Sequence, residues 1–172
     1  MRKIFLIIAI VISLFSSEYT VDKEYSSIKF EANKMFFVGV SGEFSQFSGR
    51  IKLSENNKLS QIDGLVLIDS INTANEERDE HLKAKDYFEM EKFPNILFKS
   101  NTIIDDTVKA TVSIKGIKKE LEFKISDYSV TDNSVTFKLS STVDRRDFLL
   151  IGPLSAIIAD NVDVVAKISA VK

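Results

Sequence analysis

Few residues in this chain carry the side chains that catalysis or metal binding requires. The 172 residues include one histidine, His81, and no cysteine. A metal site built from several His or Cys ligands is therefore excluded, and a Ser–His–Asp triad would need His81 as its base. The sequence also contains no Gly-x-Ser-x-Gly segment, the turn that presents a nucleophilic serine in many hydrolases. We therefore predict that the protein is not an enzyme and uses no cofactor.

Acidic residues are the remaining candidates for acid–base chemistry. The aspartates that could pair in this way are Asp69, Asp79, Asp86, Asp147 and Asp160. Charged side chains are common at protein surfaces, so their presence alone indicates little. Arg78 and Asp79 fit better as an ion pair near the start of a helix, and His81 fits better as a residue that packs on that helix.

The elements that must position these residues are predominantly β-strands. Apolar and polar residues alternate with a period of two, which is typical of a strand with one buried face. In residues 119–125, for example, Leu121, Phe123 and Ile125 alternate with charged side chains. The same alternation predicts strands at 26–32, 96–103, 109–115, 135–143 and 162–172, and residues 62–71 are apolar on both faces.

Short polar turns separate these strands. Turn residues lie at 55–57, 105–106 and 131–133, and Lys115-Gly116 joins two strands as a tight hairpin. About eight strands with short connections predict an antiparallel sheet. Because nearly every strand has a polar face, we expect an antiparallel barrel or a strongly curled sheet, which hides its edges.

Two segments depart from the strand pattern. Residues 75–88 are predicted to form a helix, and Thr73 followed by Glu76 has the spacing of a capping box. Pro94 then restarts an extended chain. A second short helix is expected at 154–159, after Pro153.

The N-terminus is typical of a secretory signal peptide. Arg2 and Lys3 precede an apolar run at 4–15, and Ser16-Ser17 follows it. The run is too short to span a bilayer, which takes about 20 residues. We predict a signal peptide at 1–17, a single domain at 18–172, and a periplasmic or otherwise secreted protein cleaved near Ser17. An uncleaved membrane anchor is the alternative.

The charge balance and the aromatic residues limit the partners of this domain. Loss of Arg2 and Lys3 takes the formal net charge from −2 to −4, which argues against nucleic acid as a partner. The charged strand faces cannot lie against hydrocarbon, so we place them outside and the apolar faces inside. The chain has 13 Phe, many at inward positions. A barrel of eight strands is either filled by such side chains or holds one small ligand, and periodicity does not decide between the two.

Several separated stretches of the sequence form a set of motifs. The most specific stretch is Arg78-Asp79-x-His81-Leu82 with the segments around it, from Ser70 to Phe98. Supporting stretches lie at 19–30, 40–49, 114–119 and 146–148. Together these stretches resemble the YceI-like family of exported, lipocalin-like barrels. The chain departs from the family pattern at Tyr25 and near Lys34-Met35, where the family often has His, and at Leu149, where it often has Gly. These changes fall at the expected mouth of the pocket.

The resemblance implies an eight-stranded antiparallel lipocalin-like barrel whose lumen binds a long apolar chain. Such a chain could be a polyisoprenoid, an isoprenoid quinone or a fatty-acid derivative, held for storage or transport, and a quinone would be ligand and not cofactor. The candidate lumen residues are Phe30, Phe44, Val66, Ile68, Phe98, Val112, Ile114, Phe123, Ile125, Phe137 and Leu139. The polar residues expected at the pocket mouth are Arg78, Asp79 and His81.

Two other functions remain open from the sequence. The first is a solid-core barrel that acts as a stress or interaction module without a ligand. The second is a hydrolase or isomerase that acts on a lipid head group with His81 and a nearby Asp. For the lipid-binding hypothesis we also expect transient membrane contact, while the oligomeric state is open between a monomer and a homodimer.

Overall fold

The protein is an antiparallel β-barrel with one α-helix at one end. The computed structural model describes residues 17–34, 37–153 and 158–172. The predicted signal peptide, apart from Ser17, and most of the predicted helix at 154–159 lie outside these residues. Within the described residues, no helix is long and apolar enough to cross a membrane.

Eight strands form a closed ring. In ring order they are β1 (Ser17–Val21), β4 (Phe47–Leu53), β5 (Leu59–Leu67), β7 (Asn95–Ile104), β8 (Thr107–Ile114), β9 (Ile117–Val130), β10 (Ser134–Asp144) and β11 (Ile158–Val171). Every pairing is antiparallel. Strand β1 closes the ring, because it pairs with β4 on one side and with the last residues of β11 on the other. The predicted eight-stranded antiparallel barrel is confirmed.

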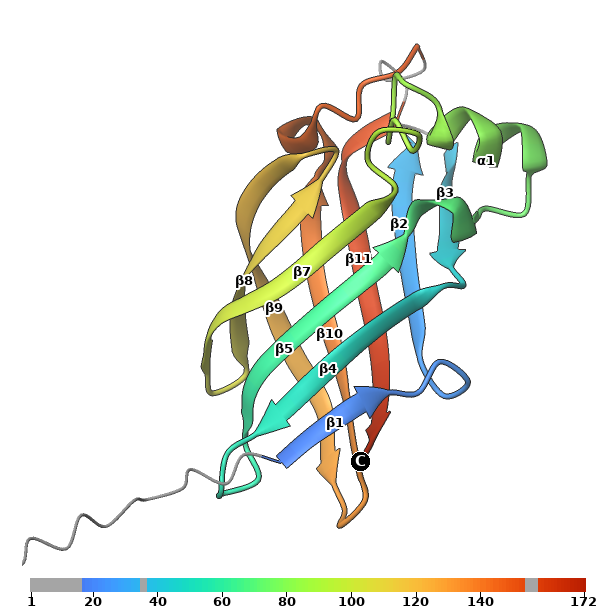
Figure 1. The fold of residues 1–172 in the computed structure, drawn as a ribbon. Coiled ribbons are helices and arrows are strands. Elements are labelled where there is room, and N and C mark those ends of the chain that lie inside the picture. Colours follow the sequence, from blue (N-terminus) through green and yellow to red (C-terminus); the bar gives the residue numbers. More distant parts are fainter. Residues whose placement is uncertain (1–16, 35–36, 154–157) are drawn as a thin grey trace, which may run out of the picture.

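Three further strands extend the wall at the other end of the barrel. They are β2 (Ser27–Lys34), β3 (Phe37–Phe44) and β6 (Ile71–Asn72), which follow β11 in the order β11-β2-β3-β6. Strand β11 therefore changes partner along its length: Ala170 and Val171 pair with β1, while residues 162–167 pair with β2. Strand β1 completes the ring at one end of the barrel, while β2, β3 and β6 extend the wall from β11 at the other end (Figure 1).

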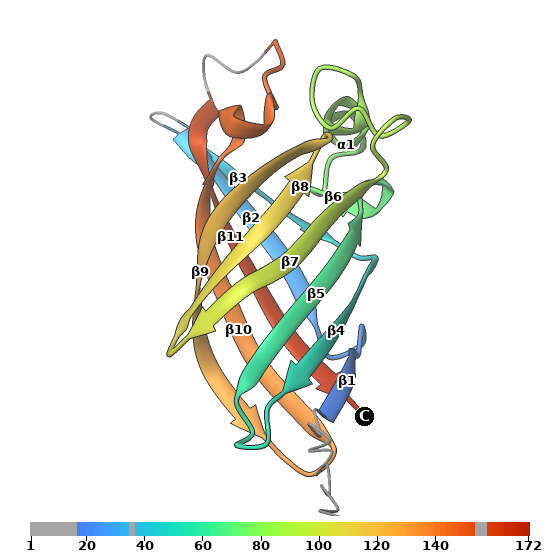
Figure 2. The same ribbon diagram turned by 60° about the vertical axis from the view of Figure 1, so that its left-hand side comes forward.

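The helix α1 (Glu76–Lys83) lies at the end of the barrel opposite β1 (Figures 1 and 2). It is shorter than the predicted 75–88, because Ala84 is extended with ψ near 169°. The predicted capping box is wrong: the N-cap is Asn75, whose side chain accepts a hydrogen bond from the backbone N–H of Arg78. We call the two ends of the barrel the α1 end and the β1 end.

Two short 3₁₀ turns shape the α1 end. The first, Ile68–Ser70, interrupts the stretch 62–71, which is apolar on both faces. This stretch therefore forms the end of β5, the turn and the start of β6. The second, Arg145–Phe148, follows β10, and its C-cap Leu149 has a left-handed backbone with φ of 53°. A leucine in this conformation costs about 1–2 kcal/mol, which a glycine would not.

Candidate functional site

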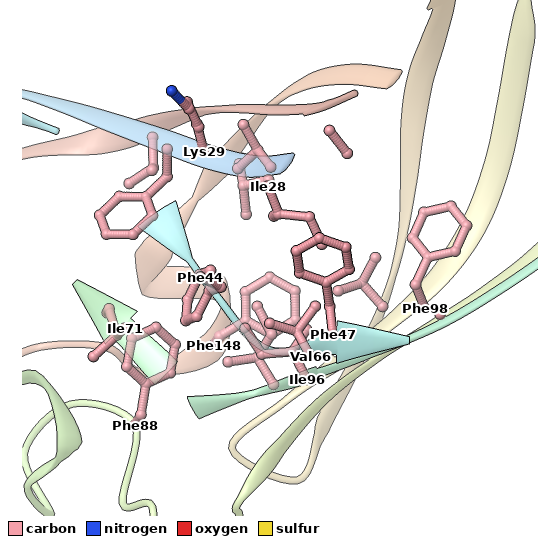
Figure 3. Close-up of a pocket in the computed structure, with 18 of the residues that line it drawn as sticks. Ile28, Lys29, Phe44, Phe47, Val66, Ile71, Phe88, Ile96, Phe98 and Phe148 are labelled. Atoms are coloured by element: carbon pink, nitrogen blue, oxygen red, sulfur yellow. The ribbon is translucent and has the colours of Figure 1, made fainter. Parts of the chain in front are cut away.

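The interior of the barrel contains a cavity of about 530 Å³. Its wall is mostly aliphatic and aromatic, with side chains from β2, β3 and β4 facing side chains from β5, β7 and the 3₁₀ turn after β10 (Figure 3). Phe44 packs against Phe30 with ring centroids 5.6 Å apart, and against Phe88 at 6.4 Å. A volume of this size is in the range of small-molecule sites. The barrel is hollow, which contradicts the solid-core alternative.

The structure brings most of the predicted lumen residues to this cavity. Those that line it are Phe30, Phe44, Val66, Phe98, Val112, Ile114, Phe123 and Leu139. Ile68 is buried in the 3₁₀ turn and packs in the wall cluster beside the cavity, because the turn breaks the strand alternation. Ile125 and Phe137 belong to the packed core at the β1 end.

Many residues that line the cavity were not among the candidate lumen residues named from the sequence. Strand β11 contributes Val162, Val164, Ala166 and Ile168, whose alternation was visible in the sequence. Tyr87, Phe88 and Leu150 line the cavity from loops, where no periodicity marks an inward side chain. Phe47, Ile51, Ile62, Ile71, Ile96, Leu121, Val143 and Phe148 also line it.

Polar side chains gather at the α1 end of the cavity. Asn75, Glu77, Arg78 and His81 of the α1 segment all line it, as does Arg145 beside the second 3₁₀ turn. Lys29, Ser48 and Asp63 of the β2, β4 and β5 wall also line the cavity, so the polar groups are concentrated at the α1 end but not confined to it. We call this polar end, together with Tyr87, Leu150 and Ile158, the mouth.

A chain of three hydrogen-bonded side chains fixes Arg78 at the mouth. Arg78 donates from Nε to Thr73 Oγ1 at 2.8 Å and from Nη2 to the Thr73 carbonyl at 2.7 Å. Thr73 is buried and donates its hydroxyl and its backbone N–H to Asp79 Oδ1. Asp79 does not line the cavity but holds Thr73, which in turn orients Arg78.

His81 lies on the same side of α1, and its ring packs edge-on against Tyr87 with centroids 6.2 Å apart. In the described part of the chain, no hydrogen bond joins the His81 ring to a carboxylate. The described residues also contain no cluster of three or more His, Cys, Asp or Glu side chains that could hold a metal ion.

Arg145 is a buried residue of the mouth and joins two segments there. It donates to the carbonyls of Leu150, Ile158 and Ala159 at 2.8–3.1 Å and forms an ion pair with Asp160 at 2.9 Å. Asp160 also pairs with Arg146, which is exposed. These bonds connect the loop after β10 to the start of β11.

Neighbouring groups stabilise the ionised forms of Asp144 and Lys83 at the α1 end of the barrel. A hydrogen bond from the Arg146 side chain lowers the pKa of Asp144, and a second one from the Arg146 backbone N–H adds to this effect. Hydrogen bonds to Glu80 and then Asp69 raise the pKa of Lys83 at the end of α1.

Comparison with known proteins agrees with this architecture. The fold and cavity define a lipocalin-like barrel protein with an internal apolar chamber. A sequence profile described as the YceI-like domain matches residues 19–170, so the chain belongs to this family. A UPF0312 protein of Staphylococcus aureus is 32% identical over 140 residues, which cover 77% of this chain and 81% of that protein.

Solved structures share the fold at lower sequence identity. BcnA of Burkholderia cenocepacia superposes with a TM-score of 0.77 at 20% identity, over 87% of this chain and 98% of that chain. A polyisoprenoid binding domain from Saccharophagus degradans gives 0.70 at 14% identity, over 89% of this chain and 97% of that chain. The YCEI protein of Campylobacter jejuni gives 0.69 at 23% identity, over 80% and 88%.

The hydrogen bonds of Asp79 lead to a prediction about stability. Replacing Asp79 by Ala leaves the buried Thr73 N–H without its acceptor, so we expect a loss of about 1–3 kcal/mol in the free energy of unfolding. Replacing the exposed Glu80 by Ala removes only a surface pair with Lys83, which is worth about 0–1 kcal/mol. Urea denaturation of both variants checks this, and equal losses would contradict the role assigned to Asp79.

Proposed function

We propose that this chain is an exported protein that holds a long apolar chain in its lumen, for storage or transport. The observation that carries the proposal is the apolar cavity of about 530 Å³. Membership of the YceI-like family and the similar fold of a polyisoprenoid binding domain support it. The candidate ligands are a polyisoprenoid, an isoprenoid quinone and a fatty-acid derivative.

The energetics favour a tail of any of these kinds. Burying one methylene is worth about 0.8 kcal/mol. A tail of about twenty carbons could therefore gain roughly 16 kcal/mol in gross transfer, before the cost of its immobilisation. Dispersion and the hydrophobic effect are not directional, so an aliphatic and aromatic wall selects the tail by size more than by chemical identity.

The head group would meet the polar mouth. Arg78 is held in place by Thr73, and His81 lies one helical turn further along α1. Both line the cavity. We infer that these two side chains face the polar end of the ligand, while the tail extends toward the β1 end.

Two adjacent valines on β11 give a matched test of the lumen. Val164 lines the cavity, whereas Val165 follows it on the other face of the strand, outside the lining residues. Replacing Val164 by Glu puts a charge in an apolar chamber, so we expect binding of cis-parinaric acid to weaken at least about tenfold. Val165→Glu should leave the affinity unchanged in the same fluorescence titration.

A second measurement addresses the natural ligand. Protein purified from its own host should carry an apolar adduct in native mass spectrometry, and the Val164→Glu variant should lack it. Circular dichroism must show the same strand content in both variants. If neither the wild type nor Val165→Glu binds an apolar probe or carries an adduct, the proposed function fails.

Export is supported by the basic start and the apolar run at 4–15. The family match begins at residue 19, after this segment. The mass of the mature protein from its host tests the proposal: we expect cleavage near Ser17. A mass that includes residues 1–17 would favour the uncleaved anchor.

Transfer of an apolar ligand calls for contact with a membrane, and we place this contact at the mouth. Leu149 is 57% exposed and Ile151 is 50% exposed, while Leu150 between them lines the cavity. Exposed apolar side chains beside the opening could enter the head-group region of a bilayer, so that the ligand would move between lipid and lumen with little exposure to water.

A charge at the mouth should therefore slow uptake without changing affinity. We expect Ile151→Asp to reduce several-fold the rate at which parinaric acid is taken up from phosphatidylcholine–phosphatidylglycerol vesicles. The control is Ile104→Asp, because Ile104 is 67% exposed but lies at the β1 end, beside the β7–β8 turn. Stopped-flow fluorescence measures both rates, and an equal effect of the two substitutions would contradict a contact at the mouth.

A further inference from the structure

The cavity ends at a definite level inside the barrel. Six strands mark this level. On each of them, toward the β1 end, one inward side chain is the last to line the cavity, and the next inward side chain does not line it. These pairs are Ile51 and Leu53, Ile62 and Leu59, Val112 and Ala110, Phe123 and Ile125, Leu139 and Phe137, and Ile168 and Ala170. Because the change occurs on β4, β5, β8, β9, β10 and β11, it marks a continuous floor.

The residues below this floor form a packed plug. Leu53, Val108, Ala110, Val135 and Ala170 have no exposed surface, and Tyr19 and Phe137 have 2% and 3%. All belong to one core cluster. A core packed at ordinary protein density has no room for a ligand atom, so a tail that enters from the mouth must stop above the plug.

Two aromatic rings lie at the level of the floor. Phe98 and Phe123 line the cavity and meet edge to face, with centroids 5.1 Å apart and an interplanar angle of 76°. Phe123 is also paired across the strands with Val108, which belongs to the plug. The rings therefore join the wall of the chamber to the packed core beneath it.

We propose that this floor sets the length of the tail that the lumen accepts, a proposal that rests on the lipid-binding function. The cavity of about 530 Å³ is in the range of small-molecule sites, so the chamber takes up a tail of limited length. A longer chain leaves its remainder outside the mouth.

A series of n-alkanols from decanol to docosanol tests the length limit by displacing cis-parinaric acid. We expect affinity to rise by up to about fourfold per added methylene, and to stop rising once the tail reaches the floor. Farnesol, geranylgeraniol and solanesol provide the same comparison for isoprenoids. Solanesol should bind no more tightly than geranylgeraniol.

Two variants move the limit in opposite directions. Ala166 lines the chamber, so Ala166→Phe fills part of it, and we expect the affinity to level off at tails shorter by about six carbons. Phe137→Ala removes volume from the plug and should move the limit to longer tails. The matched control is Val165→Phe, which adds a similar ring outside the lining residues and should leave the limit unchanged.

The outcomes distinguish a failure of the proposed length limit from a failure of the proposed lipid-binding function. If no alkanol of any length displaces the probe, the lipid-binding function fails. If alkanols bind but affinity levels off at the same length in the wild type and in Ala166→Phe, the floor does not set the limit. Phe137→Ala can unfold the protein, since such truncations cost about 3–5 kcal/mol. Ala166→Phe then decides alone.

Discussion

The closure of the barrel wall is the constraint on which the rest of the structure depends. Strand β1 has five residues and completes a ring of eight strands at one end only. At the other end β2 and β3 take its place beside β11. An eight-stranded barrel is just wide enough for side chains to fill its interior, and at the α1 end β2, β3 and β6 widen the wall beyond these eight strands. The packed plug and the hollow chamber therefore both follow from where β1 ends.

The strand alternation predicts which face of a strand is buried but not how deep a residue lies along the barrel. Phe123 and Ile125 share a face of β9, as Leu139 and Phe137 share a face of β10. Only Phe123 and Leu139 line the cavity. Depth depends on strand tilt and on the register between strands, which are set by contacts between segments far apart in the sequence. The fold class could thus be predicted, whereas the alternation does not show that Ile125 and Phe137 lie in the packed core and Ile68 in the wall cluster.

Local chemistry at the mouth was harder to predict. Thr73 and Glu76 have the spacing of a capping box, yet Asn75 caps α1, and Thr73 is used instead to connect Arg78 with Asp79. Both arrangements satisfy the first turn of the helix, so spacing alone does not separate them. The role of Arg145 could not be predicted from the sequence either, because the carbonyls that it binds come together only in the folded chain.

The division of the barrel into plug and chamber also divides single strands. Strands β9 and β11, each of 14 residues, run from the plug to the mouth, so one continuous strand belongs to a dense core at one end and to the wall of a void at the other. Void walls lose dispersion contacts, which makes local opening easier there. A bound tail would supply the missing neighbours. The ligand would then act as the last part of the hydrophobic core, and amide hydrogen exchange near the mouth would report its arrival.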